Sequence, residues 1–388
     1  MKKDKLLIKV LLLLYLLYFS QGIVYGQSSI ISQLALLCIL IICCVSLVKS
    51  FLLVRKHNYF YKIWTSFLFL NILGFILTSS FSNVINFGMF KGVLVTSLSF
   101  YPFYYVSLKM IQIKQYLTVF LFLMLPLSIA HYYTNQISIF ADRITDNTNV
   151  VNNAAYLFVS LIPFLFFIKR KIISYILLAI ISFFIIGAAK RGALIAGILG
   201  VLVYLYYLLK EQSIENKLKR IRIYLVLLIG LIIVGYFAYN QFLENEFLKN
   251  RLEEMVEGNT SNRTENYTLI WEGWLSAESF VHLIFGFGFA ASREMTGGLF
   301  AHNDWMEALS NFGLLGFTLY LFLFINLIKN IKKNTCTLEE RMQLIAITLI
   351  WFFMTLVSMF YTSLNSFLMV MLLGYLIGRD KIRNDSKK

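Results

Sequence analysis

The chain has 388 residues, of which 59% are hydrophobic and only 14% are charged, and its formal net charge at pH 7 is +15. Soluble globular proteins are roughly half apolar and about a quarter charged, so soluble and disordered chains are excluded. Many apolar runs approach the ~20 residues that a membrane-spanning helix needs, and they lack the alternation of barrel strands, so the sequence predicts an all-α polytopic membrane protein.

Hydropathy predicts about twelve spans in chain order. The N-terminal run resembles a signal peptide, but no clean cleavage site follows it, and we interpret it as a retained first helix. Lys91 is the main charged residue predicted inside a span. The predicted spans are 6–25, 29–53, 63–81, 84–107, 116–132, 151–168, 172–189, 192–209, 223–242, 313–328, 343–362 and 366–378.

The positions of Lys and Arg orient these spans. With the N-terminus inside, the basic segments 55–56, 169–171 and 217–220 fall in cytoplasmic connections, as the positive-inside rule requires. The basic tail, 379–388, is then cytoplasmic as well. Basic residues on that face accompany membrane insertion, so the net charge does not indicate nucleic-acid binding, and we expect no nucleic-acid partner.

One predicted connection is far longer than the others. Residues 243–312, between spans nine and ten on the outer face, make up about 70 residues, and loops of such length are usually functional. We therefore divide the chain into spans one to nine (1–242), an outer-face helical loop domain (243–312), and spans ten to twelve with the basic tail (313–388). No internal repeat is visible, which disfavours a transporter built from duplicated halves.

A few cations are predicted to face outward against this charge bias. The pair Lys190-Arg191, followed by Gly192, lies in the tight turn between spans seven and eight. Two interpretations stay open: contact with lipid headgroups, or a site for a lipid-linked phosphate, which arginine binds through two parallel hydrogen bonds. The outward cations are Arg143, Lys190, Arg191, Lys249, Arg251, Arg263 and Arg293.

The long outer segment has a helical pattern of its own. Residues 245–256 predict a short amphipathic helix, and a second helix is predicted to begin at Arg263. A stripe of apolar residues on the second helix suits either the membrane surface or internal packing. The stripe consists of Ile270, Trp271, Trp274 and Leu275.

A third predicted helix follows His302. Asp304 and Glu307 have the spacing of a capping box, so the helix is predicted to begin at that point. A helix N-terminus attracts phosphate and favours the neutral imidazole that a general base needs. His131 and His282 are rivals on the same predicted face, and a lone histidine is more often structural than catalytic.

Three stretches together resemble the superfamily of O-antigen polymerases and O-antigen ligases, which are glycosyltransferases of the bacterial envelope. Asn152-Asn153-Ala154-Ala155 is a weaker fourth element. The three stretches are Ala188-Ala189-Lys190-Arg191-Gly192-Ala193-Leu194; Asn262-Arg263-Thr264 with Trp271 and Trp274; and Gly286-Phe287-Gly288, Ala301-His302-Asn303 and Asn311-Phe312-Gly313-Leu314-Leu315-Gly316.

The resemblance implies a metal-independent glycosyl transfer, without a cofactor, on the outer face of the bacterial cytoplasmic membrane. The implied partners are an undecaprenyl-pyrophosphate-linked oligosaccharide, membrane lipids and, as a further candidate, a chain-length regulator. Arg191 and Arg263 match the arginines that hold the pyrophosphate, and His302 matches the histidine that activates the acceptor. Lys190 stands where the family usually has serine.

The same elements contain further candidate residues, and they leave a small set of functions open. The expected substrate-binding residues are Lys190, Gly192, Asn303 and Gly288. We favour a polymerase that joins lipid-linked repeats. The alternatives are a ligase that transfers glycan to lipid A–core, and a flippase of lipid-linked oligosaccharide.

Overall fold

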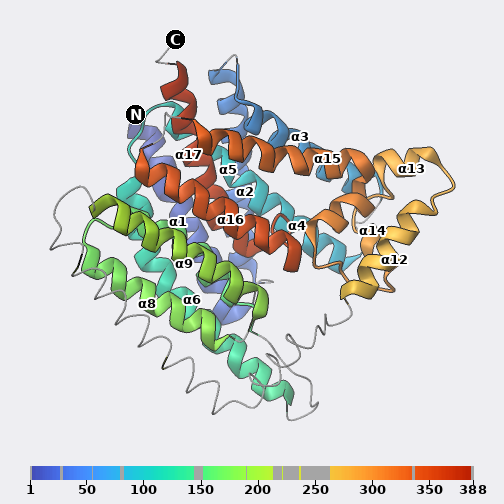
Figure 1. Cartoon of the computed structure of the whole chain (residues 1–388), viewed down its shortest axis with the longest axis horizontal. Coiled ribbons are helices and arrows are strands. Elements are labelled where there is room, and N and C mark those ends of the chain that lie inside the picture. Colours follow the sequence, from blue (N-terminus) through green and yellow to red (C-terminus); the bar gives the residue numbers. More distant parts are fainter. Residues whose placement is uncertain are drawn as a thin grey trace. The chain divides into compact units, whose positions relative to one another are not determined.

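In the computed structural model the described residues are helical apart from short connections, and they contain no strand (Figure 1). This agrees with the predicted all-α class. The structure describes residues 2–26, 29–54, 56–78, 83–143, 152–188, 190–212, 221, 236, 263–333 and 337–385.

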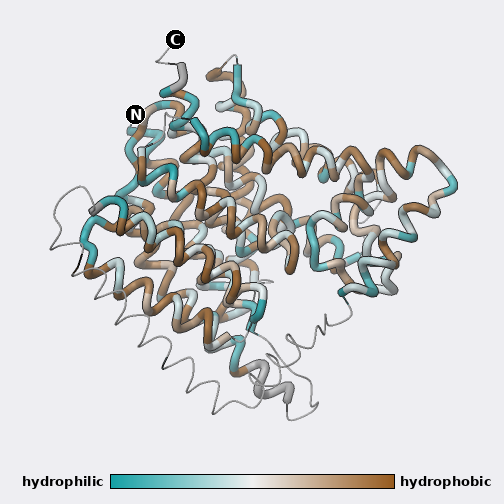
Figure 2. Tube along the Cα trace, in the orientation of Figure 1, coloured by the Kyte–Doolittle hydropathy of each residue, from teal (hydrophilic) through white to brown (hydrophobic). Residues whose placement is uncertain are grey.

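Among these residues, seven helices are long and apolar enough to cross a membrane. Hydrophobic residues cover most of the length of such helices, and hydrophilic residues gather at helix ends (Figure 2). The membrane class is therefore confirmed, while the count of about twelve spans stays a prediction. The seven are α1 (Lys2–Tyr25), α2 (Ile30–Leu53), α3 (Tyr59–Leu77), α6 (Lys114–Arg143), α9 (Arg191–Gln212), α15 (Asp304–Lys332) and α16 (Leu338–Val357).

The remaining helices are shorter or less apolar. Predicted span nine (223–242), apart from Tyr236, and the predicted helix 245–256 lie outside the described residues. The other elements are α4 (Val84–Leu98), α5 (Phe100–Leu108), α7 (Ala155–Leu161), η2 (Ile162–Phe167), α8 (Lys171–Gly187), α12 (Arg263–Leu275), α13 (Phe280–Phe285), α14 (Ala291–Met295), η3 (Leu364–Ser366) and α17 (Phe367–Asp385).

Asparagine side chains fix the beginning of three of these helices. The Asn58 Oδ1 accepts a hydrogen bond from the Tyr61 N–H at the start of α3. Asn83 caps α4 through the N–H groups of Ile85 and Asn86. Asn303 caps α15 in the same way. The first N–H groups of a helix have no partner within it, and a short polar side chain supplies one.

The described chain forms two compact units. Unit 1 comprises Met1–Ile42, Ile111–Gly258 and Cys336–Ile350. Unit 2 comprises Cys43–Met110, Asn259–Thr335 and Trp351–Lys388. Each unit therefore gathers segments that are far apart in the sequence.

Unit 1 contains α1, the helices from α6 to α9, and parts of α2 and α16. The short helix α7 is followed directly by the 3₁₀ helix η2. Pro163, near the start of η2, has no backbone N–H and cannot donate a backbone hydrogen bond. The buried Gln343 of α16 donates its Nε2 to the Pro163 carbonyl at 2.8 Å. Phe158 stacks on Phe184 with ring centroids 4.9 Å apart, which joins α7 to α8.

Unit 2 has its most extensive helix contact between α5 and α17. Gly374 and Gly378 lie one turn apart on α17 and allow this close approach. A Cβ at Gly374 would lie 2.2 Å from the Phe100 carbonyl oxygen. Small residues four apart commonly permit such packing between membrane helices.

Helix α15 bends sharply at Gly313, where the backbone has φ 59° and ψ −153°. At such a bend the carbonyls of the preceding turn lose their normal partners. Here the Phe287 N–H donates to the Ser310 carbonyl at 2.9 Å, and the Gly288 N–H donates to the Asn311 carbonyl at 3.0 Å. The Gly-x-Gly segment therefore completes the hydrogen bonds of the bend.

We predict that Gly286→Ala destabilises the protein far more than Gly297→Ala. Both glycines have positive φ, at 76° and 72°, so both variants carry backbone strain. Only at Gly286 would the new Cβ collide with backbone, 2.4 Å from the Asn311 carbonyl carbon, whereas nothing lies within 4 Å at Gly297. Thermal unfolding of the full chain in detergent, followed by tryptophan fluorescence, measures the difference. Equal losses for the two variants would contradict the packing described above.

Candidate functional site

The predicted outer cations of unit 1 lie at the turn between α8 and α9. Arg191 is the first residue of α9 and is half-buried, and Gly192 behind it is buried. The Lys190 Nζ lies 5.9 Å from the centroid of the Tyr156 ring. Two cationic side chains thus stand at a helix N-terminus, which itself attracts anions.

The weak Asn152 element packs against this turn. The Asn152 N–H donates to the Ala188 carbonyl at 3.2 Å, and the Tyr132 hydroxyl donates to the Gly187 carbonyl at 2.9 Å. The Asn152 Nδ2 in turn donates to the Tyr132 carbonyl at 3.0 Å. The carbonyls at the end of α8 are thereby paired, and α6 and the segment just before α7 hold the basic turn in place.

His302 lies immediately before α15 in unit 2, as predicted. Its backbone adopts the left-handed conformation with φ 51°, and its side chain is exposed. Both neighbours, Ala301 and Asn303, are buried. The imidazole is therefore presented to the surroundings by a backbone that is anchored on each side.

Asn303, rather than Asp304, is the N-cap of α15. The Asn303 Oδ1 accepts from the N–H groups of Trp305 and Met306, and its Nδ2 donates to the Leu356 carbonyl at 3.4 Å. The predicted capping box is therefore wrong: Asp304 is the first helical residue, and Glu307 does not reach back to the cap. Both ends of the Asn303 amide are engaged within the protein.

Asp304 and Glu307 are instead fully buried and bind distant segments. The Asp304 carboxylate accepts from the Tyr320 hydroxyl at 2.6 Å and from the Phe360 N–H at 3.0 Å. Buried carboxylates require such partners because their desolvation is costly. Asp304 thus ties the start of α15 to the segment that follows α16.

Glu307 anchors the residue before the histidine. Its Oε1 accepts from the Ala301 N–H at 2.9 Å, and its Oε2 accepts from the Ser292 hydroxyl at 2.7 Å. Sequence reasoning missed this positioning role. The signal in the sequence was the pair of acids, Asp304 and Glu307, at the start of an apolar helix. A local capping box explains such a pair equally well.

Arg263 opens α12, which packs against α14 and α15 in unit 2 (Figure 1). The arginine is half-buried. Tyr267, one turn later on the same helix face, donates its hydroxyl to the Leu356 carbonyl at 3.4 Å, the same oxygen that Asn303 binds. Tyr267 of α12 and Asn303 therefore share the Leu356 carbonyl as their hydrogen-bond acceptor.

The apolar stripe of α12 differs from the prediction. Ile270 and Trp274 are buried as expected, and Asn266 joins them one turn earlier. Trp271 and Leu275 are exposed, because they lie on the neighbouring face. The helix thus buries a narrower stripe, and one tryptophan of the pair stays accessible.

The other candidates have structural partners. Gly288, an expected substrate-binding residue, gives its N–H to Asn311, and a Cβ there would lie 1.8 Å from the Thr78 methyl carbon. Arg293 donates to the Asn86 Oδ1 at 2.9 Å. His282 stacks on Phe287 with ring centroids 4.7 Å apart.

The candidate site therefore consists of two described parts. Lys190, Arg191 and Gly192 lie together in unit 1, and Arg263, His302 and Asn303 lie in unit 2. Convergence of the two parts stays a prediction. Within the described residues, no three or more His, Cys, Asp and Glu side chains gather as a metal site would require.

Residues 176–321 match a family model described as O-antigen ligase. The matched range contains Arg191, Arg263 and His302. The resemblance to the O-antigen ligase and polymerase superfamily is thereby confirmed, and the family implies a ligase-like or polymerase-like glycosyltransferase in the membrane. No curated protein matches the chain.

We predict that Asn303→Ala destabilises the protein, whereas Asn303→Asp retains most of the stability. Aspartate keeps the oxygen that caps α15, and loss of a cap typically costs about 1 kcal/mol. Thermal unfolding midpoints in detergent, measured together with glycan synthesis in cells, test this. If Asn303→Asp is as stable as wild type but synthesises no glycan, Asn303 has a substrate-binding role beyond capping.

Proposed function

We propose that the protein is a membrane glycosyltransferase that polymerises undecaprenyl-pyrophosphate-linked oligosaccharides on the outer face of the bacterial cytoplasmic membrane. The family match supports this class of function. The observation that carries the proposal is the exposed His302 imidazole, held at the start of α15 by Ala301 and Asn303.

The donor would bind through its pyrophosphate. Arg191 and Arg263 supply guanidinium groups, which match pairs of phosphate oxygens through two parallel hydrogen bonds. Arg191 adds its charge to that of the α9 N-terminus, and Gly192 adds no side chain beside it. Lys190 is a further cation for the same group.

The transfer itself needs a base and a stabilised leaving group. An acceptor sugar hydroxyl attacks the anomeric carbon of the donor, its proton passes to the His302 imidazole, and the bond from that carbon to the pyrophosphate oxygen breaks. Undecaprenyl pyrophosphate leaves with the bonding electrons. The two arginines stabilise the negative charge that develops on the leaving oxygen.

The phenotype of a deletion strain distinguishes the three candidate functions. For a polymerase, deletion of the gene leaves single repeats on the cell surface. For a ligase, deletion leaves long chains accumulated on the lipid carrier. For a flippase, lipid-linked oligosaccharide is trapped on the cytoplasmic side, although the few charged residues in the spans disfavour transport.

We predict that Arg191→Ala, Arg263→Ala and His302→Ala each lower the rate of chain growth by on the order of 10²–10³. The measurement is the size distribution of surface polysaccharide in a deletion strain that expresses each variant at equal membrane level. The matched control is His282→Ala, because His282 is an exposed histidine of the same unit that only stacks on Phe287.

The control variant should give a normal ladder of chain lengths. Normal ladders from all three test variants would dismiss this site. Loss of chains in the His282 control alone would transfer the role of base to that residue.

A further inference from the structure

A cleft of about 800 Å³ lies within unit 1, at helix ends that carry none of the candidate site residues. It is bordered by the start of α1, the start of α6, the connection from η2 to α8, the end of α9 and the start of α16. The charge bias predicts each of these ends on the cytoplasmic face. Within unit 1, the cleft lies at the opposite ends of α8 and α9 from Lys190 and Arg191.

Among the charged residues that line this cleft, basic residues outnumber acidic ones. Five basic residues border it, against two acidic ones, Glu211 and Glu339. The basic residues are Lys5, Lys114, Lys169, Arg170 and Lys171.

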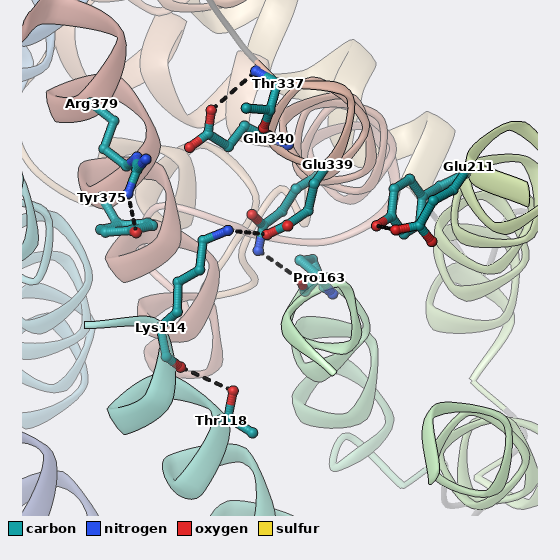
Figure 3. A network of polar contacts seen from close by, with 11 residues as sticks. Lys114, Thr118, Pro163, Glu211, Thr337, Glu339, Glu340, Tyr375 and Arg379 are labelled. Atoms are coloured by element: carbon teal, nitrogen blue, oxygen red, sulfur yellow. Dashed lines mark hydrogen bonds and ion pairs between the residues drawn. The ribbon is translucent and has the colours of Figure 1, made fainter. Parts of the chain in front are cut away.

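Each carboxylate has one lysine as its partner. The Lys114 Nζ lies 2.6 Å from the Glu339 Oε1, and the two side chains point toward each other in Figure 3. Lys171 pairs with Glu211. Lys5, Lys169 and Arg170 form no ion pair with another described residue, so the cleft keeps an excess of positive charge.

The same cleft has an apolar side. Val119 and Phe122 of α6 line it, and their exposed fractions are 56% and 42%. Ile173 of α8 and Phe166 of η2 lie along the same cavity. A cationic pocket that opens onto exposed apolar side chains matches a ligand with an anionic head and a hydrocarbon tail.

We propose that this cleft binds the phosphate headgroup of an anionic phospholipid, with Lys169 and Arg170 as the principal contacts. Basic pockets between membrane helices at a cytoplasmic surface bind such headgroups, and each nearby cation contributes to the attraction. The acyl chain lies along Val119 and Phe122. This site shares no residue with the proposed glycan site, and the proposal does not depend on that function.

The test uses the purified full-length chain, stripped of lipid in detergent. Native mass spectrometry counts the lipid retained after addition of phosphatidylglycerol, or of phosphatidylethanolamine with the same acyl chains. The wild type should retain the anionic lipid preferentially. The double variant Lys169→Gln with Arg170→Gln should bind phosphatidylglycerol roughly tenfold more weakly.

Two matched variants make the result specific. Lys329→Gln with Lys332→Gln removes the same charge from the end of α15, outside the cleft, and should leave binding unchanged. Lys169→Arg with Arg170→Lys keeps the charge and should retain binding.

The proposal fails if both glutamine variants weaken binding equally, because general attraction to the basic face would then suffice. It also fails if millimolar inorganic phosphate displaces the lipid completely, since the cleft would then be a site for free phosphate. Equal retention of the two lipids by the wild type would overturn it as well.

Discussion

The hydrogen bonds at the bend of α15 hold together the part of unit 2 that carries the histidine. In a membrane, a backbone group without a partner is costly, so a helix can bend sharply only where other groups replace the lost hydrogen bonds. The segment from Gly286 to Gly288 provides these replacements for Ser310 and Asn311. Because that contact is backbone against backbone, the facing positions at Gly286 and Gly313 have no room for a Cβ.

The bend separates a short helical start from the longer remainder of α15. The start is fixed independently of the rest, since Asp304 binds the Phe360 N–H and Glu307 binds the Ala301 N–H. Both carboxylates are buried, and neither faces the surroundings. Their role is therefore to position the backbone on each side of His302. An exposed imidazole on a rigid support suits proton transfer better than one on an unanchored loop.

The cations of the chain serve different physical purposes. Those at helix ends of the predicted cytoplasmic face accompany insertion, and five of them line one cleft in unit 1. Lys190 and Arg191 are predicted on the opposite face and stand at a helix N-terminus, which attracts anions. Arg293, another cation predicted to face outward, donates hydrogen bonds to Asn86 and Gly298. The charge of a residue alone therefore did not distinguish Arg293, which has structural partners, from the candidate site residue Arg263.

The sequence by itself determined the membrane class, the approximate positions of most helices, the basic turn at Lys190-Arg191, and the place of His302 before a helix. These features depend on hydropathy, charge and short spacing, which are local. Only the tertiary structure decided that Asp304 and Glu307 are buried anchors, and that Asn152 packs on the α8–α9 turn. The partners of these side chains, such as Phe360, Ser292 and Ala188, are selected by packing between distant segments. No local pattern records that selection, because the same acids at the same spacing would equally suit a solvated helix start.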